Sequence, residues 1–187
     1  MNKLIIITIL FVTFGYAQNT NDREKQDDNI EIKSKNFDNL YRINDSIYRS
    51  EQPSKKGFIE LDTSGIKTIV NLRRLRNDIK KAKGTDLQLE HIPLTTKQIT
   101  EQDIFEVIQH IDNAEKPLLI HCWHGSDRTG VMVAAYRIVI ENWSKEKAIK
   151  EFRTKKFGYH ENKYPNLLYL LEHLNVEDIK KQLKTTN

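Results

Sequence analysis

Hydrophobic and polar positions along this chain form short blocks that predict strands alternating with helices. Runs rich in β-branched or alternating apolar residues predict strands at 67–72, 87–92 and 118–121. A hairpin is expected at 42–49, where apolar residues flank an Asn-Asp-Ser turn. Because strands separated by helices form parallel sheets, the pattern predicts a single α/β domain with a mostly parallel central sheet flanked by helices.

Helices are predicted where a capping residue precedes apolar positions at helical spacing. They are expected at 53–62, 100–111, 129–141 and 144–152, with one or two more after residue 164. Segment 129–141 is apolar almost all round, which predicts a buried central helix. The basic stretch 73–83 is expected to be helical in part, and the strand at 87–92 to stop at Pro93.

The N-terminal part differs in character from the rest. A lysine near the start, an apolar stretch at 4–14 and small residues after it predict a secretory signal peptide at 1–17. That stretch is shorter than the roughly 20 residues of a membrane span, so an uncleaved anchor is the disfavoured alternative. Residues 18–37 are polar and are expected to form a disordered linker, which leaves 38–187 as the domain. We therefore expect an exported protein, periplasmic or secreted, without a stable membrane span.

Charge and cysteine content narrow the function classes. The 187 residues include 30 basic and 26 acidic ones; removal of 1–17 takes away one lysine and no acidic residue, which leaves a net charge of +3. Nucleic-acid-binding domains usually carry a concentrated basic face, so we expect no binding to nucleic acid. The single cysteine, Cys122, cannot form an internal disulfide, and a lone thiol in an exported protein indicates reactivity.

One segment carries a specific chemical pattern, because residues 121–130 read His-Cys-Trp-His-Gly-Ser-Asp-Arg-Thr-Gly. Apolar runs on both sides predict a strand, a loop and a helix in succession. A loop at a helix N-terminus binds anions, because unpaired N–H groups and the helix dipole both favour negative charge. The Cys122 thiol adds a nucleophile and the Arg128 guanidinium adds a phosphate clamp. Residues 122–128 are here called the motif loop.

His-Cys, five residues and Arg-Thr-Gly resemble the signature of cysteine-dependent protein tyrosine phosphatases, and the chain is similar to small bacterial members of their dual-specificity branch. The resemblance extends over 38–175 and includes the segments 48–53 and 71–73. It implies a phosphomonoesterase that uses a phosphocysteine intermediate on Cys122, with no metal or other cofactor. The expected partner is a phosphorylated protein or a small phosphate ester, and we expect a monomer.

The expected roles of the motif residues follow from their chemistry and agree with what the resemblance implies. Cys122 is the nucleophile, because a helix N-terminus and a neighbouring cation favour the thiolate. Arg128 grips two phosphate oxygens with a planar fork that lysine lacks. Thr129 is expected to donate a hydrogen bond to the sulfur, and His121 to order the loop by hydrogen bonding. The expected substrate-binding residues, most of them acting through backbone amides, are Trp123, His124, Gly125, Ser126, Asp127, Arg128 and Arg73.

The motif does not by itself identify the proton donor for the leaving oxygen. The resemblance implies an aspartate on a loop upstream of the cysteine, but residues 91–100 contain no carboxylate. Asp127 is the favoured candidate, because a bound phosphate beside it favours its protonated form. Asp103 and Glu101 follow, although both also fit a helix-capping pair. The alternative for Asp127 is a hydrogen bond from backbone N–H groups that stabilises the loop.

Residues beside the motif loop are open to two interpretations each. Arg73 and Arg74 follow a predicted strand, and they either bind a second anionic group or form an exposed basic surface. Trp123 either lines the site or packs under the loop. Residues 157–160 either form part of the pocket wall, with Tyr159 stacking on a phosphotyrosine ring, or pack on the core.

Other functions compete with ester hydrolysis. A phosphoinositide or inositol phosphate phosphatase is one, although Trp123 and His124 stand where such enzymes often carry lysines. A non-catalytic phosphate-binding protein is another, although binding alone needs no thiol. The Arg-Thr-Gly ending disfavours a sulfur-transferring enzyme, and an arsenate reductase would need further cysteines. A metal site of His121, Cys122 and His124 is disfavoured, because ligands so close at a strand end do not converge on one ion.

Overall fold

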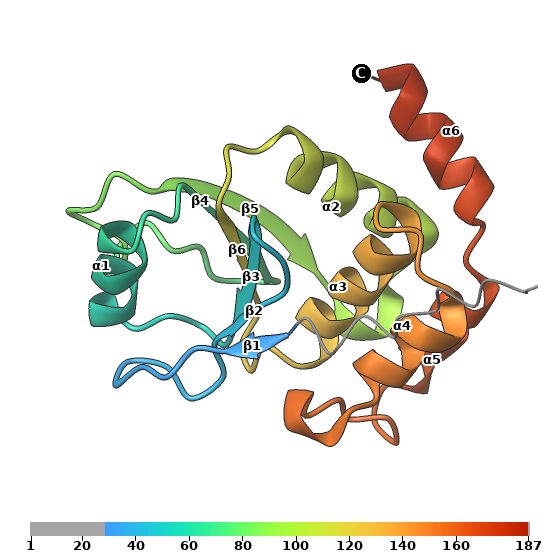
Figure 1. Ribbon diagram of the computed structural model, residues 1–187, viewed down its shortest axis with the longest axis horizontal. Coiled ribbons are helices and arrows are strands. Elements are labelled where there is room, and N and C mark those ends of the chain that lie inside the picture. The colour runs from blue at the N-terminus through green and yellow to red at the C-terminus, as the bar shows by residue number, and fades with distance from the viewer. Residues whose placement is uncertain (1–28, 187) are drawn as a thin grey trace, which may run out of the picture.

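The computed structural model describes residues 29–186, and Figure 1 shows its sheet between α1 at one end and the other helices at the opposite end. The strands are β1 (Ile30–Glu31), β2 (Tyr41–Arg42), β3 (Ile47–Ser50), β4 (Thr68–Arg73), β5 (Gln88–Leu94) and β6 (Leu118–His121). The helices are α1 (Lys55–Thr63), α2 (Glu101–Asn113), α3 (Asp127–Val139), α4 (Lys145–Phe152), α5 (Pro165–His173) and α6 (Val176–Thr186), with 3-10 turns η1 (Thr96–Gln98) and η2 (Lys155–Phe157).

The sheet has the strand order β1-β2-β3-β6-β4-β5. The strands β3, β6, β4 and β5 run parallel, and β1 and β2 add an antiparallel edge. All four residues of β6 are buried, which is typical of a parallel strand with both faces covered. The predicted α/β domain with a mostly parallel central sheet is therefore confirmed.

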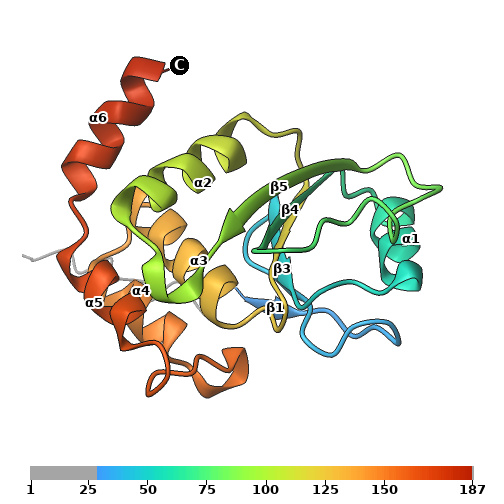
Figure 2. The ribbon, with the colours of Figure 1, turned by 180° about the vertical axis from the view of Figure 1, so that it is seen from behind.

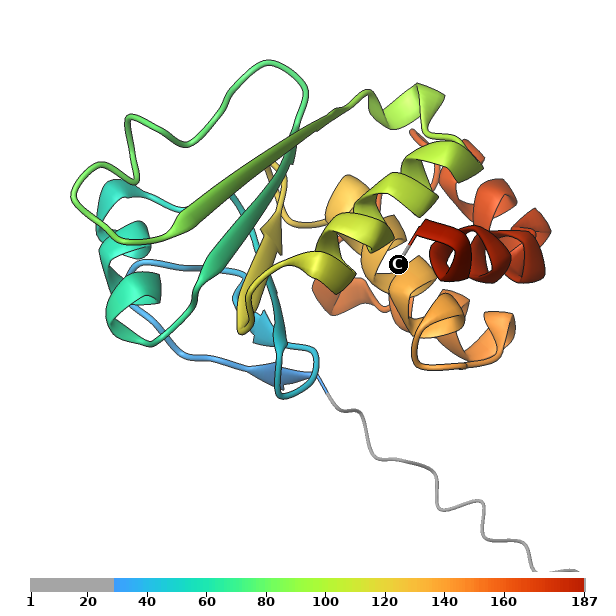
Figure 3. The same cartoon turned by 90° about the horizontal axis from the view of Figure 1, so that it is seen from above.

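Helices cover both faces of this sheet. Along β6, Leu118 and Ile120 belong to the core cluster that contains residues of α2 to α6, whereas Leu119 belongs to a second cluster with residues of α1. Figures 2 and 3 show α1 alone on its side of the sheet and the other helices together on the opposite side. As its apolar pattern predicts, α3 is buried almost all round. Because only residues 122–126 join β6 to α3, the N-terminus of this central helix lies at the carboxyl edge of the sheet.

The expectation of partial helix at 73–83 is wrong, because residues 74–87 of the described chain form turns and irregular loop. The cause lies at the end of β4. The Asn71 side chain accepts a hydrogen bond from the Arg73 N–H and donates one to the Arg76 carbonyl, both 2.8 Å. Such bonds give the backbone an alternative to helical pairing. Buried Asp78 and Ala82 then fix the loop against the domain.

The strand expected at 87–92 does not stop at Pro93, because β5 continues through this proline to Leu94. Proline lacks the N–H that a central strand must donate, but an edge strand tolerates it. β5 is such an edge, since it pairs with β4 alone in the described sheet.

The N-terminal expectations are only partly within the described residues. The signal peptide expected at 1–17 and residues 18–28 of the expected linker lie outside them. The disordered linker is wrong for residues 30–31, which form β1 and pair with β2. The Ile32 N–H extends this pairing by donating to the Leu40 carbonyl (2.9 Å). Polar composition misses this strand because its stability comes from pairing with a distant segment.

The remaining predicted elements are confirmed with small shifts of their ends. The hairpin forms from β2 and β3, Ser54 caps α1, Thr100 and Asp103 form the capping box of α2, and Ser144 caps α4. α3 begins at Asp127, two residues earlier than expected. None of the helices within residues 29–186 combines the length and the apolar character needed to cross a bilayer.

Candidate active site

The motif loop turns between β6 and α3 with its carbonyl groups held outward. The Trp123 carbonyl accepts a hydrogen bond from the Gln52 N–H (3.1 Å), the His124 carbonyl from Asn39 Nδ2 (2.8 Å) and the Gly125 carbonyl from Arg49 Nη2 (2.7 Å).

Because each peptide unit is planar and trans, the N–H groups of residues 124–126 point away from these outward carbonyls. None of the three donates to another group in the described part of the chain. They form a concave set of free donors at the N-terminus of α3, the arrangement that binds anions. The predicted anion loop is therefore held in shape by side chains and backbone of residues 39–52 and not by the motif alone.

Gly125 is the residue that lets the loop make this turn. Its φ angle is +72°, and a Cβ atom on it would lie 2.5 Å from the Ser50 carbonyl oxygen and 2.7 Å from the Glu51 nitrogen. Both neighbours are backbone atoms at the end of β3, so they cannot move aside like the end of a side chain. Only glycine fits here.

Gly125→Ala is therefore expected to lower the free energy of unfolding by about 3 kcal/mol or more, from backbone strain and overpacking together. Urea unfolding of the variant and the parent measures this. Gly84→Ala is the matched control: Gly84 has a φ of +90° and nothing within 4 Å of its Cβ position, so it loses only about 1 kcal/mol from the backbone. Equal losses at the two positions would contradict the close approach of the loop to Ser50.

Arg49 lies beneath the loop as a fully buried cation, and the sequence patterns did not identify it as a site residue. Its guanidinium donates to the Gly125 carbonyl and lies 4.3 Å from the centre of the Phe157 ring. Burial lowers the pKa of Arg49 to about 10, so the group stays charged at neutral pH. The charges of Arg49 and Cys122 interact, as do those of Arg73 and Cys122. The buried Cys122 therefore lies close to two cations and to the N-terminus of α3.

Arg128 and Thr129 stand in the first turn of α3, where the motif places them. Arg128 Nη1 donates to the Leu72 carbonyl at the carboxyl end of β4 (3.1 Å), which fixes the guanidinium beside the loop. Thr129 Oγ1 is buried and has no hydrogen-bond partner in the described part of the chain. The expected hydrogen bond from Thr129 to the Cys122 sulfur is therefore not formed in this structure, and the hydroxyl is a free donor.

Trp123 and Arg73 form the outer rim of the loop. Trp123 is 52% exposed, so the interpretation that it packs under the loop is wrong. The Arg73 guanidinium lies 4.4 Å from the centre of the indole ring and also donates to Gln52 Oε1. Arg73 thus lies at the site as expected, whereas Arg74 is exposed and has no hydrogen bond or ion pair to the described loop residues.

His121 and Asp78 form a buried pair behind Cys122. His121 Nδ1 lies 3.0 Å from the Cys122 carbonyl and Nε2 lies 2.8 Å from Asp78 Oδ2, while Gln52 Nε2 donates to Asp78 Oδ1 (2.8 Å). The prediction that His121 orders the loop by hydrogen bonding is confirmed. Both ring nitrogens face oxygen acceptors, so neither is available to a metal ion.

The buried Asp78 carboxylate is stabilised by its partners. Burial raises its pKa, but the hydrogen bonds and charge of His121 and the bond from Gln52 outweigh burial and hold the pKa below its ordinary value. Because folding lowers this pKa, the carboxylate stabilises the fold at pH values above its unfolded-state pKa of about 4. This contribution is lost as the pH falls from there through the lower pKa of the folded state.

Asp78→Asn is expected to lower the free energy of unfolding by about 3 kcal/mol at pH 7, because it leaves the buried His121 without its charged partner. The difference in free energy of unfolding between parent and variant is expected to become smaller below about pH 4, because the parent loses the contribution of its carboxylate there. Urea unfolding at pH 7 and pH 3 measures both. A gap that stays constant over this range would contradict the pairing.

The three candidate proton donors have different surroundings. Asp103 Oδ2 accepts from the N–H and the hydroxyl of Thr100, both 2.7 Å, and Glu101 Oε1 accepts from the Asn175 N–H (2.9 Å). Asp103 is thus bound in the capping box and Glu101 to the chain after α5, away from the motif loop. Asp127 accepts from the backbone N–H of His160 (2.9 Å), so the backbone bond expected as its alternative role is present, with a partner outside the loop.

The segment 157–160 packs beside the motif loop and partly into the core. Tyr159 stacks on Phe152 with ring centres 4.0 Å apart and donates to the Tyr164 carbonyl (2.7 Å). Burial raises the pKa of Tyr159 to about 12. The interpretation that Tyr159 packs on the core is therefore confirmed. His160, which sequence patterns did not single out, is the residue of this segment that contacts the loop.

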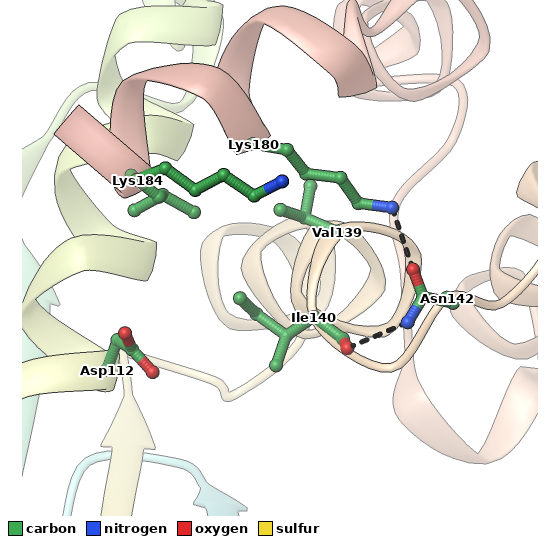
Figure 4. A pocket seen from close by; sticks show the side chains of 7 residues that line it. Asp112, Val139, Ile140, Asn142, Lys180 and Lys184 are labelled. Carbon is green, nitrogen blue, oxygen red and sulfur yellow. Dashed lines mark hydrogen bonds between the residues drawn. The ribbon is translucent and has the colours of Figure 1, made fainter.

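A separate cavity of about 420 Å³ lies at the opposite end of α3. Its walls include Val139, Ile140 and Lys184, and Lys180 Nζ donates to Asn142 Oδ1 (2.7 Å) across one side (Figure 4). The 13 residues of α3 separate it from the motif loop by about 18 Å. It takes no part in the chemistry at Cys122.

The chain is similar to known proteins in sequence and in fold. The family described as DSP-PTPase phosphatase fused to NAD+ kinase matches residues 20–166. The dual specificity protein phosphatase TpbA of Pseudomonas aeruginosa strain UCBPP-PA14 is 31% identical over 123 residues, which are 64% of this chain and 56% of TpbA. The chain thus matches little more than half the length of this relative.

Solved structures agree on the fold. A cysteine-to-serine variant of P. aeruginosa TpbA in complex with pTyr superposes with a TM-score of 0.75 at 24% identity, covering 83% of this chain and 95% of TpbA. The core catalytic domain of the PP-IP phosphatase SIW14 from S. cerevisiae superposes with a TM-score of 0.64 at 24% identity, over 75% of this chain and 88% of that domain. Since the family match spans most of the sequence, the chain belongs to the dual-specificity type of protein tyrosine phosphatases.

Proposed function

We propose that this protein is a phosphomonoesterase of the tyrosine or dual-specificity type that works through a phosphocysteine on Cys122. One observation carries the proposal: the inward amides of residues 124–126, the thiol of Cys122 and the guanidinium of Arg128 meet at one edge of the sheet. Amides and a cation are sufficient to bind phosphate. The buried thiol among cations adds the nucleophile that turnover requires.

In the first step the Cys122 thiolate attacks phosphorus. A P–S bond forms, the P–O bond to the leaving group breaks, and its electron pair goes to the leaving oxygen. The amides of residues 124–126 and the Arg128 fork bind the other phosphate oxygens and stabilise their charge during the transfer. Because outward hydrogen bonds already hold the loop, these donors need no rearrangement when the substrate binds.

In the second step water attacks phosphorus and releases inorganic phosphate. The P–S bond breaks and its electron pair returns to sulfur as the thiolate. The free Thr129 hydroxyl is suited to donate to the sulfur at this point, because it has no other partner in the described residues. Such a bond lowers the barrier by stabilising the thiolate as a leaving group.

The rim of the site supports an aromatic phosphate ester on a protein as the substrate. The exposed Trp123 ring, with Arg73 above it, offers an aromatic face and a cation beside the loop. The name of TpbA and its complex with pTyr favour the same class. Arg73 also supports an inositol phosphate as the second candidate, because a second cation suits a second phosphate group, and SIW14 is named a PP-IP phosphatase.

Hydrolysis of 4-nitrophenyl phosphate by the purified chain in EDTA tests the function. We expect turnover that EDTA does not reduce, because the mechanism uses no metal. A phosphotyrosine peptide, a phosphoserine peptide and an inositol phosphate, compared by kcat/KM, then rank the substrate classes. Binding of phosphate without turnover of any of these esters would replace the proposal by the phosphate-binding alternative.

A further inference from the structure

Asp127 and His160 form a carboxylate–imidazole pair on the motif loop. The Asp127 carboxylate lies 3.0 and 3.2 Å from His160 Nδ1 through its two oxygens, and Oδ1 also accepts the His160 backbone N–H (2.9 Å). Because the partner atoms are carboxylate oxygens, Nδ1 carries the hydrogen. These three contacts fix both the backbone and the ring of His160 relative to the first turn of α3.

The pair lies beside the motif loop, with the His160 side chain toward the surface rather than in the core. Asp127 precedes Arg128 directly, and the backbone at Gly158 approaches Ser126 of the motif loop so closely that an added Cβ would lie 3.1 Å from its hydroxyl. The His160 ring centre lies 6.1 Å from that of His124. Asp127 is nearly buried, whereas the His160 side chain is 50% exposed.

We propose that His160 is the proton donor to the leaving oxygen and that Asp127 positions it. This proposal rests on the phosphatase function proposed above. It answers the lack of a free carboxylate among the three candidates from the sequence, because Asp103 and Glu101 are bound elsewhere and both Asp127 oxygens are held by His160. His160 Nε2 has no hydrogen-bond partner in the described residues, so it is the atom left to face a substrate.

His160 gives up one proton in the first step and regains one in the second step. As the P–O bond breaks, the imidazolium gives its Nε2 proton to the leaving oxygen, which departs as an alcohol or phenol. The Asp127 carboxylate accepts the Nδ1 hydrogen and so orients the ring for this transfer. The neutral ring then accepts a proton from the water that attacks the phosphocysteine, which restores the imidazolium and yields phosphate.

The test uses the dependence of kcat/KM on the leaving group, because this ratio covers the steps up to departure of the leaving oxygen and not the later hydrolysis of the phosphocysteine. Phenol, with a pKa near 10, needs a proton when it leaves, whereas 4-nitrophenol leaves far more easily without one. His160→Gln is expected to lose about 100-fold in kcat/KM on phenyl phosphate and less than about 10-fold in kcat/KM on 4-nitrophenyl phosphate. Added imidazole is expected to restore part of the phenyl phosphate rate in His160→Ala.

The matched control is His110→Gln. His110 is 51% exposed and also pairs with a carboxylate, Glu90 (2.8 Å), on the outer side of α2, so its loss is expected to change neither rate. Asp127→Asn keeps an oxygen acceptor for the His160 N–H and removes the charge. It is expected to show a smaller leaving-group-dependent loss than His160→Gln.

Three outcomes overturn the proposal while leaving the phosphatase function intact. These are an equal loss on both esters in His160→Gln, no rescue by imidazole, or a larger leaving-group-dependent loss in Asp127→Asn, which assigns the proton to Asp127 itself. Failure of the parent to hydrolyse either ester refutes the proposed function instead, so the two failures are distinguishable.

Discussion

Cys122→Ser is expected to lower kcat on 4-nitrophenyl phosphate by about 10⁴-fold or more, because it removes the nucleophile. A serine hydroxyl has nearly the shape of the thiol but does not ionise near neutral pH. Serine is therefore a far weaker nucleophile than cysteine in the same surroundings. Steady-state kinetics at pH 7 measures the loss.

The same variant is expected to keep its affinity for inorganic phosphate within a few-fold. The amides of residues 124–126 and the Arg128 guanidinium bind the oxygens and are unchanged. Isothermal titration of parent and variant with phosphate separates binding from chemistry. Turnover by Cys122→Ser comparable with that of the parent would show that another group attacks phosphorus.

Arg128→Lys is expected to lower kcat by about 10³-fold, the second largest effect at this site. Lysine keeps the charge but not the planar fork, so it cannot bind two phosphate oxygens and the Leu72 carbonyl together. Because the fork acts most strongly on the transferring group, kcat is expected to fall more than phosphate affinity does.

Arg42→Lys is the matched control for this substitution. Arg42 forms an exposed ion pair with Asp45 in the hairpin and has no part in the motif loop. Its replacement is expected to leave kcat within about twofold of the parent value, because an exposed ion pair outside the loop contributes little. A similar rate for Arg128→Lys and Arg42→Lys would contradict the role of the fork.

The path from β6 through the motif loop into α3 was predictable, because it depends on local patterns. Apolar runs on both sides of residues 122–128 predict the strand and the helix, and the helix N-terminus predicts the anion site. The residue types at Cys122 and Arg128 then indicate the chemistry. None of these inferences requires a contact between distant segments.

The groups that hold the loop in place were not predictable in the same way. Arg49 reaches the Gly125 carbonyl across 76 residues of sequence, and Asp78 reaches His121 across 43. Such partners arise only when β3, β6 and the loop after β4 meet at one edge of the sheet. The one indication of Arg49 in the sequence was that segment 48–53 resembles phosphatase sequences.

The proposed proton donor was likewise not predictable from the sequence, because it depends on a contact between distant segments. The motif places Asp127 beside Arg128, and chemistry then favours it as the acid. Its partner His160 lies 33 residues further along, in a segment that sequence patterns assigned to the pocket wall or the core. The Asp127–His160 contact depends on the fold, which packs the chain after α4 against the first turn of α3.

The central claim is that phosphate passes through a covalent bond to Cys122, and trapping that bond tests it most directly. The full chain is mixed with a ³²P-labelled aryl phosphate, quenched in acid during turnover, digested and analysed by mass spectrometry. We expect label on the peptide that contains Cys122, with none in Cys122→Ser. Turnover without labelled protein, or label on another residue, would contradict it.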